Sequence, residues 1–172
     1  MKLPLDRMQS FIANGSVTAS AVRGRHGGKG VMRVAIKFLS ELPVKSLVDP
    51  KFFPTLLDEE TRNLQRKFPP DFQFWGTARK CLNIFLRGAF YNVLLRETYD
   101  LGTLDEVLET PLDSHVAKGL KRDAPDRALP RWQTIIGLTP KDNALYQEVA
   151  RDVARKRYHT YRVNLDLWYW RT

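Results

Sequence analysis

Two short segments of the sequence each place a reactive side chain where a helix is expected to begin. Residues 74–80 read FWGTARK and end on Lys80, and residues 111–118 read PLDSHVAK and contain Asp113. The positive end of a helix dipole disfavours an ammonium group and favours a carboxylate. We therefore expect Lys80 to supply a neutral amine, which is a nucleophile, and Asp113 to remain ionised beside it.

Both segments resemble motifs of one family. FWGTARK resembles the hairpin of the helix-hairpin-helix DNA glycosylases, in which a glycine hairpin leads into Arg-Lys, and PLDSHVAK resembles their Asp-Thr/Ser-His-Val-x-Arg segment. The chain has Trp75 and Ala78 where that hairpin carries proline and glycine. The resemblance covers residues 56–118. The 33-residue spacing of Lys80 and Asp113 is closer to the archaeal 8-oxoguanine glycosylases than to endonuclease III.

The resemblance implies a role for each matched position. Lys80 would be the nucleophile that attacks the sugar as the base leaves, and Asp113 would be the essential aspartate of the reaction. Neither a metal nor a cofactor is implied. The residues that we expect to contact DNA are Trp75, Gly76, Thr77, Arg79, His115 and Lys118.

Aromatic residues near the first motif suit a base that has left the helix stack. Enzymes that act on a base within a duplex flip it out and grip it by stacking on aromatic rings. We take Trp75 as a candidate wedge and Phe74 and Trp132 as candidates for the base pocket. The alternative for all three rings is an ordinary place in the core.

The spacing of apolar residues predicts an all-α fold, a single domain over residues 1–172 with a helix-hairpin-helix element. A glycine-rich, basic loop is expected over residues 14–30. Asp113 and Thr139 are expected to cap the helices that follow them. Helices are predicted over residues 31–42, 54–67, 77–95, 104–109, 132–137 and 161–170, besides those that follow the two caps.

The composition suits a protein that binds a polyanion. Lys and Arg number 28 against 19 Asp and Glu, a net charge of +9, which favours contact with nucleic acid phosphates. The lone Cys81 and the scattered His26, His115 and His159 show no metal-ligand spacing. Without an apolar run long enough to span a bilayer or a signal peptide, we expect a monomer in the cytoplasm, associated with the nucleoid and not with a membrane.

These expectations favour a DNA glycosylase with associated lyase activity that acts on double-stranded DNA and leaves an abasic site. Two modified bases are candidate substrates: 8-oxoguanine, in base-excision repair, and the glucosylated hydroxymethylcytosine of phage DNA, in antiviral defence. The alternative is a helix-hairpin-helix module that binds DNA without catalysis. A weaker alternative, an RNA-binding or membrane-surface protein, rests on charge alone.

Overall fold

A computed structural model describes residues 4–17 and 29–170, and over these ranges the chain is helical and contains no strand. The all-α prediction is therefore confirmed. No helix in the described part is long and apolar enough to cross a membrane. The α-helices are α1 (Leu5–Ser16), α2 (Lys29–Ser40), α3 (Phe53–Lys67), α4 (Trp75–Tyr91), α5 (Val93–Tyr99), α6 (Ser114–Asp123), α7 (Pro140–Arg157) and α8 (Leu165–Tyr169).

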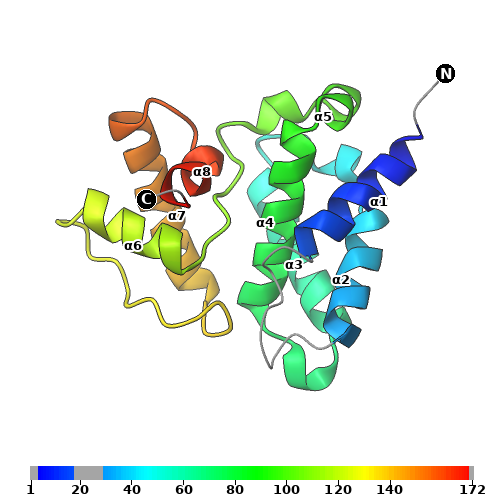
Figure 1. Ribbon diagram of the computed structural model, residues 1–172, viewed down its shortest axis with the longest axis horizontal. Helices are drawn as coiled ribbons and strands as arrows, with labels where there is room; N and C mark the ends of the chain where they lie inside the picture. Colours follow the sequence, from blue (N-terminus) through cyan, green and yellow to red (C-terminus); the bar gives the residue numbers. More distant parts are fainter. Residues whose placement is uncertain (1–3, 18–28, 171–172) are drawn as a thin grey trace.

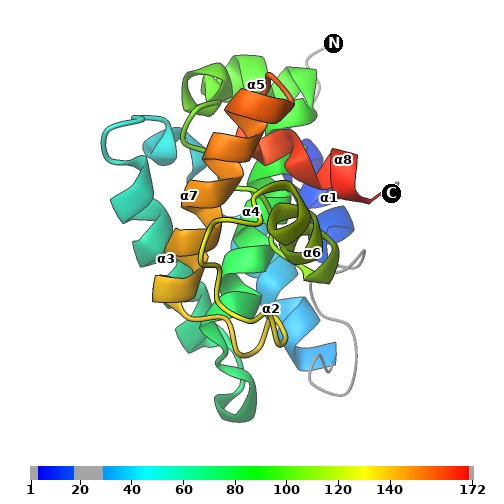
Figure 2. The same ribbon diagram turned by 90° about the vertical axis from the view of Figure 1, so that its left-hand side faces the viewer.

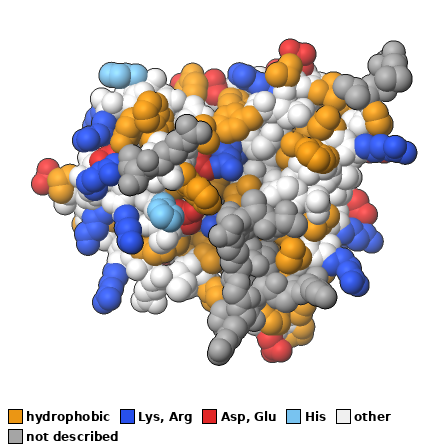
Figure 3. Space-filling model, in the orientation of Figure 1, with side chains coloured by type: hydrophobic (Ala, Val, Ile, Leu, Met, Phe, Trp, Pro, Cys, Tyr) orange, Lys and Arg blue, Asp and Glu red, His pale blue; other side chains and the backbone are white. Residues whose placement is uncertain are grey.

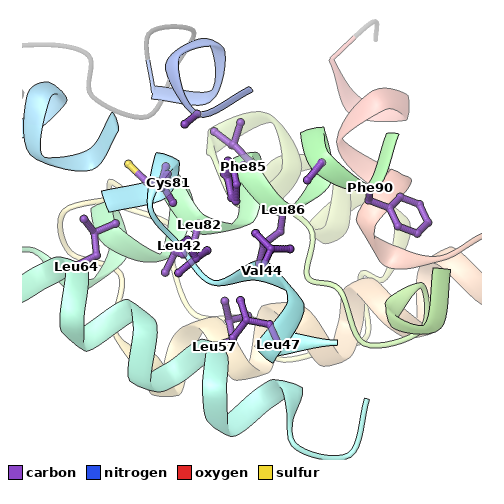
Figure 4. Close-up of a cluster of buried hydrophobic side chains, with 14 of the residues drawn as sticks. Leu42, Val44, Leu47, Leu57, Leu64, Cys81, Leu82, Phe85, Leu86 and Phe90 are labelled. Carbon is purple, nitrogen blue, oxygen red and sulfur yellow. The ribbon is translucent and has the colours of Figure 1, made fainter. Parts of the chain in front are cut away.

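The helices form two halves that meet beside α4 (Figures 1 and 2). The larger half holds α1 to α5 and encloses its own hydrophobic cluster. Figure 4 shows Leu82, Phe85 and Leu86 of α4 among the side chains of α3 and of the short helix Val44–Leu47. Because α4 supplies side chains to the middle of this cluster, its position is fixed by the packing of the whole half.

The smaller half, α6 to α8, encloses a second cluster. Val116 and Leu120 of α6, Val149 of α7 and Leu165 of α8 are buried in it. Gly119 lets α6 approach α8 closely, because a Cβ at that position would lie 2.4 Å from the Tyr169 ring. Trp75, the first residue of α4, packs against this second cluster. The start of α4 thus belongs to both halves.

Local signals placed several helices correctly. Helices predicted over residues 31–42 and 54–67 correspond to α2 and α3. Asp113 caps α6, and the Thr139 hydroxyl accepts a hydrogen bond from the Asp142 amide at the start of α7. The closing helix predicted over 161–170 is present as a short 3-10 turn, Arg162–Asn164, followed by α8.

The helix predicted over residues 77–95 is in fact two helices. It breaks at Asn92, whose backbone is extended and whose side chain accepts a hydrogen bond from the Leu95 amide. The side chain thus caps α5, and an asparagine competes with the helix for backbone groups in this way. The apolar spacing continues across the break, so periodicity alone could not reveal it.

Two short helices that the sequence predicts are absent. In place of a helix over 104–109, the chain makes the 3-10 turn Leu101–Leu104 and then extends; Thr110 exchanges backbone hydrogen bonds with the Gln147 side chain of α7. Over 132–137 the structure has only a turn. At Thr110 a tertiary partner replaces the helical hydrogen bonds that periodicity suggested, whereas residues 132–138 make local turn hydrogen bonds.

The expected loop over residues 14–30 is shorter than predicted. Helix α1 continues to Ser16 and α2 begins at Lys29, so both ends of the expected loop are helical. The basic residues Arg23, Arg25 and His26 lie outside the described residues. Helix α1 itself was not expected, because its buried side includes Gln9 and Ser16 and its apolar pattern is weak.

Candidate active site

Lys80 and Asp113 lie together where the two halves meet. The Lys80 Nζ is 3.9 Å from Asp113 Oδ2, and the two side chains are 8% and 16% exposed. One residue belongs to the first turns of α4 and the other precedes α6, so the pair joins the two halves of the molecule. The structure therefore brings together the two residues that the sequence singled out.

The geometry of the Asp113 carboxylate follows from its role as the cap of α6. Its Oδ1 accepts hydrogen bonds from the backbone amides of His115, at 2.9 Å, and Val116, at 3.0 Å. These amides would otherwise have no partner in the helix. With Oδ1 held in this way, Oδ2 is left to face the lysine. The carboxylate is thereby fixed in orientation without a further side chain.

Arg87 and Asp166 form a second ion pair that the sequence analysis missed. Arg87 lies two helical turns after Lys80 on α4, and its guanidinium pairs with Asp166 of α8. Burial lowers the pKa of Arg87, and the charges of Tyr91 and Asp113 oppose that effect. The field of Asp113 therefore reaches Arg87, which places both ion pairs along one side of α4.

Asp166 carries a buried oxygen whose hydrogen-bonding capacity is not used by the described residues. Its side chain is 6% exposed, and its Oδ1 accepts no hydrogen bond from the residues that the structure describes. One turn later, Trp170 is 55% exposed and its ring lies 6.0 Å from the ring of His115 on α6. Polar groups for hydrogen bonding and an open aromatic face are thus supplied by α8.

Arg79 is placed differently from what we expected. It is buried, and its guanidinium donates two hydrogen bonds to Glu109, both of 2.8 Å, and one to Asp58. Glu109 also accepts from the amides of Asn83 and Asn143. We call Arg79, Asn83, Glu109 and Asn143 the Glu109 network. Because this network occupies its guanidinium, Arg79 is not presented to a DNA phosphate.

The Glu109 network is an ionised cluster inside the protein. Burial alone would raise the pKa of Glu109, but the charge and hydrogen bonds of Arg79, the charge of Arg162 and the hydrogen bond from Asn83 together outweigh it and hold that pKa below its usual range. The network links α4 with the segment before α6, which carries Glu109, and with α7. It therefore holds the two halves in register directly beside Lys80.

Gly76 and Thr77 are buried as well, so the start of α4 is not open. A Cβ at Gly76 would lie 2.0 Å from the carbonyl oxygen of Ile135. The segment that carries Ile135 and Leu138 therefore lies directly on the first turn of α4. The amides around these two positions, which we expected to bind a phosphate, face protein in this structure.

The three aromatic candidates are partly buried. Trp75 stacks against Arg79, with the guanidinium 5.3 Å from the ring centre. Trp132 meets the Tyr146 ring edge-on and lines a small hollow whose lining includes neither Lys80 nor Asp113. Phe74 immediately precedes α4. The structure therefore does not bring Trp132 to the ion pair, whereas the exposed Trp170 ring lies against His115, two residues after Asp113.

The other groups near Lys80 limit the kinds of catalysis that the site could support. Burial raises the pKa of Cys81 to about 12, against the opposing charge of Lys80, so its thiol stays protonated and is a poor nucleophile. Among residues 4–17 and 29–170, no cluster of His, Cys, Asp or Glu could hold a metal ion. His115 and Lys118, by contrast, are exposed on α6, where contact with DNA is possible. The site is thus an amine and a carboxylate between two halves.

Comparisons with known proteins do not assign the chain to a family. No protein-family model, no curated protein and no solved structure matches the chain.

Proposed function

We propose that the protein is a DNA glycosylase with lyase activity, which removes a modified base from double-stranded DNA. The observation that carries the proposal is the contact of Lys80 with Asp113, two residues 33 positions apart that the resemblance to helix-hairpin-helix glycosylases had paired. Helices α3 and α4, joined by residues 68–74, would be the helix-hairpin-helix element.

In this mechanism Asp113 first accepts a proton from the Lys80 ammonium. The neutral amine attacks the C1′ carbon while the bond from C1′ to the base breaks, and the base leaves with that electron pair and takes up a proton. The base takes up the proton that Asp113 had accepted, so the restored carboxylate stabilises the positive charge on the sugar. The bond from C1′ to O4′ then breaks and O4′ takes a proton from Nζ, which leaves a protonated Schiff base between Nζ and C1′. Loss of a proton from C2′ then expels the 3′ phosphate.

Arg87, Asp166 and Trp170 supply the features that recognition of a flipped base requires. A guanidinium donates hydrogen bonds, the unpartnered Asp166 oxygen accepts one, and the open Trp170 ring offers a stacking surface. A hydrogen-bond donor together with an acceptor can pair with the edge of 8-oxoguanine and also with the hydroxyl groups of glucosylated hydroxymethylcytosine. Both bases are candidate substrates, so base-excision repair and antiviral defence are both candidate roles.

Borohydride trapping tests the proposal directly. Duplexes that carry each candidate base are incubated with the protein and borohydride, which reduces a Schiff base to a stable adduct. We expect a covalent complex with one duplex, its loss in Lys80→Ala, and no adduct with unmodified DNA. A protein that binds DNA but gives neither an adduct nor an abasic site with any of the duplexes would be the non-catalytic binding module instead.

A matched variant tests whether the adduct is lost because the amine is missing or because the positive charge is missing. Lys80→Arg keeps the positive charge opposite Asp113 but has no amine that can form a Schiff base. We expect Lys80→Arg to bind DNA and to give no adduct. An adduct of undiminished yield in either variant would assign the nucleophile to another residue.

A further inference from the structure

The exposed face of α6 is basic over its whole length. Val116, Ala117 and Leu120 turn inward, and His115, Lys118, Lys121 and Arg122 are exposed. The one acidic residue of the helix, Asp123, has a fully buried side chain that pairs with Arg122. Neither lysine forms an ion pair with any residue in the described ranges. This face therefore presents uncompensated positive charge.

Other helices also carry exposed cations, but α6 differs from them in starting at Asp113. Arg33 and Lys37 are exposed on α2, and Arg62 and Arg66 on α3, and both of these helices belong to the larger half. On α7 the exposed cations Arg155 and Arg157 pair with Glu106 and Asp123. Figure 3 shows that lysine and arginine side chains gather on the left of the face it presents, in the half formed by α6 to α8. The exposed cations of α6 are thus the ones that follow directly on the candidate site along the chain.

The position of the basic face ties it to the site. Helix α6 begins directly after Asp113, so the row of His115, Lys118 and Lys121 starts at the ion pair and leads away from it. Residues three apart lie on one side of a helix, and the row extends over about 9 Å. Long lysine side chains at this spacing can reach successive phosphates of one strand.

We infer that the exposed face of α6 holds the backbone of the bound duplex, with Lys118 and Lys121 each neutralising one phosphate. The inference rests on the proposed function for its ligand, double-stranded DNA, and goes beyond it in adding Lys121 and in giving the direction of the strand. The row starts beside the amine, so the strand held there leads into the Lys80–Asp113 site.

The test is the salt dependence of binding to a short unmodified duplex, measured by fluorescence anisotropy over a series of sodium chloride concentrations. Each phosphate contact adds about 0.9 to the slope of the logarithm of affinity against the logarithm of salt. We expect Lys118→Ala/Lys121→Ala to reduce this slope by about 1.8, and Lys118→Arg/Lys121→Arg to retain it.

A control pair removes the same charge elsewhere. Lys45 lies in the short helix Val44–Leu47 and Lys51 lies just before α3, and both are exposed. Lys45→Ala/Lys51→Ala should keep the wild-type slope. An unchanged slope in the α6 variant, an equal loss in the control pair, or a loss seen only with duplex RNA would overturn the inference.

Base excision separates this inference from the proposed function. Excision is therefore scored with the wild-type protein at saturating concentration, so that its outcome does not depend on the two lysines of α6. Normal excision together with an unchanged salt slope in the α6 variant would refute the DNA-binding role of α6 and still support the proposed glycosylase. A reduced slope in a protein that excises no base would support DNA binding by α6 and refute the glycosylase.

Discussion

Asp113 divides its two carboxylate oxygens between two partners, and this division makes its charge and its capping role separable. In Asp113→Asn, the amide oxygen can still accept from the His115 and Val116 amides, because asparagine is an equally good cap. The negative charge opposite Lys80 is lost. We expect excision to fall about 10²- to 10⁴-fold, the usual contribution of a general base, while the cap of α6 is kept.

Asp113→Ala is the matching control, because it removes the cap together with the charge. It should lose excision to the same degree and, in addition, about 1 kcal/mol of stability. Single-turnover excision and thermal unfolding measure the two effects. If Asp113→Asn excised the base at the normal rate, the carboxylate would have no part in the reaction.

At the scale of the element, the first turn of α4 depends on a glycine for the space it leaves. In Gly76→Ala, the new methyl group would collide with the Ile135 carbonyl, so the overlying segment must move. We expect a loss of about 1–3 kcal/mol, the usual cost of overpacking. Denaturant unfolding, followed by the midpoint at constant slope, measures the change.

Gly15→Ala provides the control within another helix. A Cβ at Gly15 meets nothing within 4 Å, so the substitution should leave stability unchanged or raise it by about 0.5–1 kcal/mol through helix propensity. Equal midpoints for the two variants would show that the segment over α4 moves without cost.

The elements show which kinds of signal a sequence carries. The caps Asp113 and Thr139 act on amides two or three residues away, so their type and position alone predict the starts of α6 and α7. Periodicity could not show that Thr110 would find its partners on Gln147, 37 residues later. Local chemistry was therefore predictable, and helices that depend on a distant partner were not.

The same division applies to the candidate site. Lys80 and Asp113 were paired through motifs, each of which lies within a few residues of a helix start. The pairing of Arg87 with Asp166 joins residues 79 positions apart, and no motif marks either one. The burial of Arg79 was likewise invisible, since an arginine beside a candidate nucleophile looks the same whether it faces DNA or a buried Glu109.

For the whole molecule, the Glu109 network makes the association of the two halves dependent on pH. The pKa of Glu109 is lower in the folded protein than in the unfolded chain. Its contribution is therefore complete above the unfolded pKa, about 4.3, and is lost as the pH falls through the folded value. We expect urea stability to decline on acidification for this reason.

Glu109→Gln isolates that contribution. It leaves the buried Arg79 without its main counter-charge, so we expect a loss of about 3–5 kcal/mol at pH 7 and a weaker dependence on acid. Glu106→Gln is the control, because the exposed Glu106–Arg155 pair is worth at most about 1 kcal/mol. Equal urea midpoints for the two variants at pH 7 would refute a structural role for the network.

The two roles of Asp113 also have a consequence for the evolution of such a protein. In the proposed reaction, the residue that accepts the proton of Lys80 is also the residue that caps α6, and asparagine can replace it in the second role alone. A lineage could therefore give up catalysis in one substitution and keep both its architecture and its hold on nucleic acid. An enzyme and a silent binding protein of this fold would then differ by a single side-chain atom.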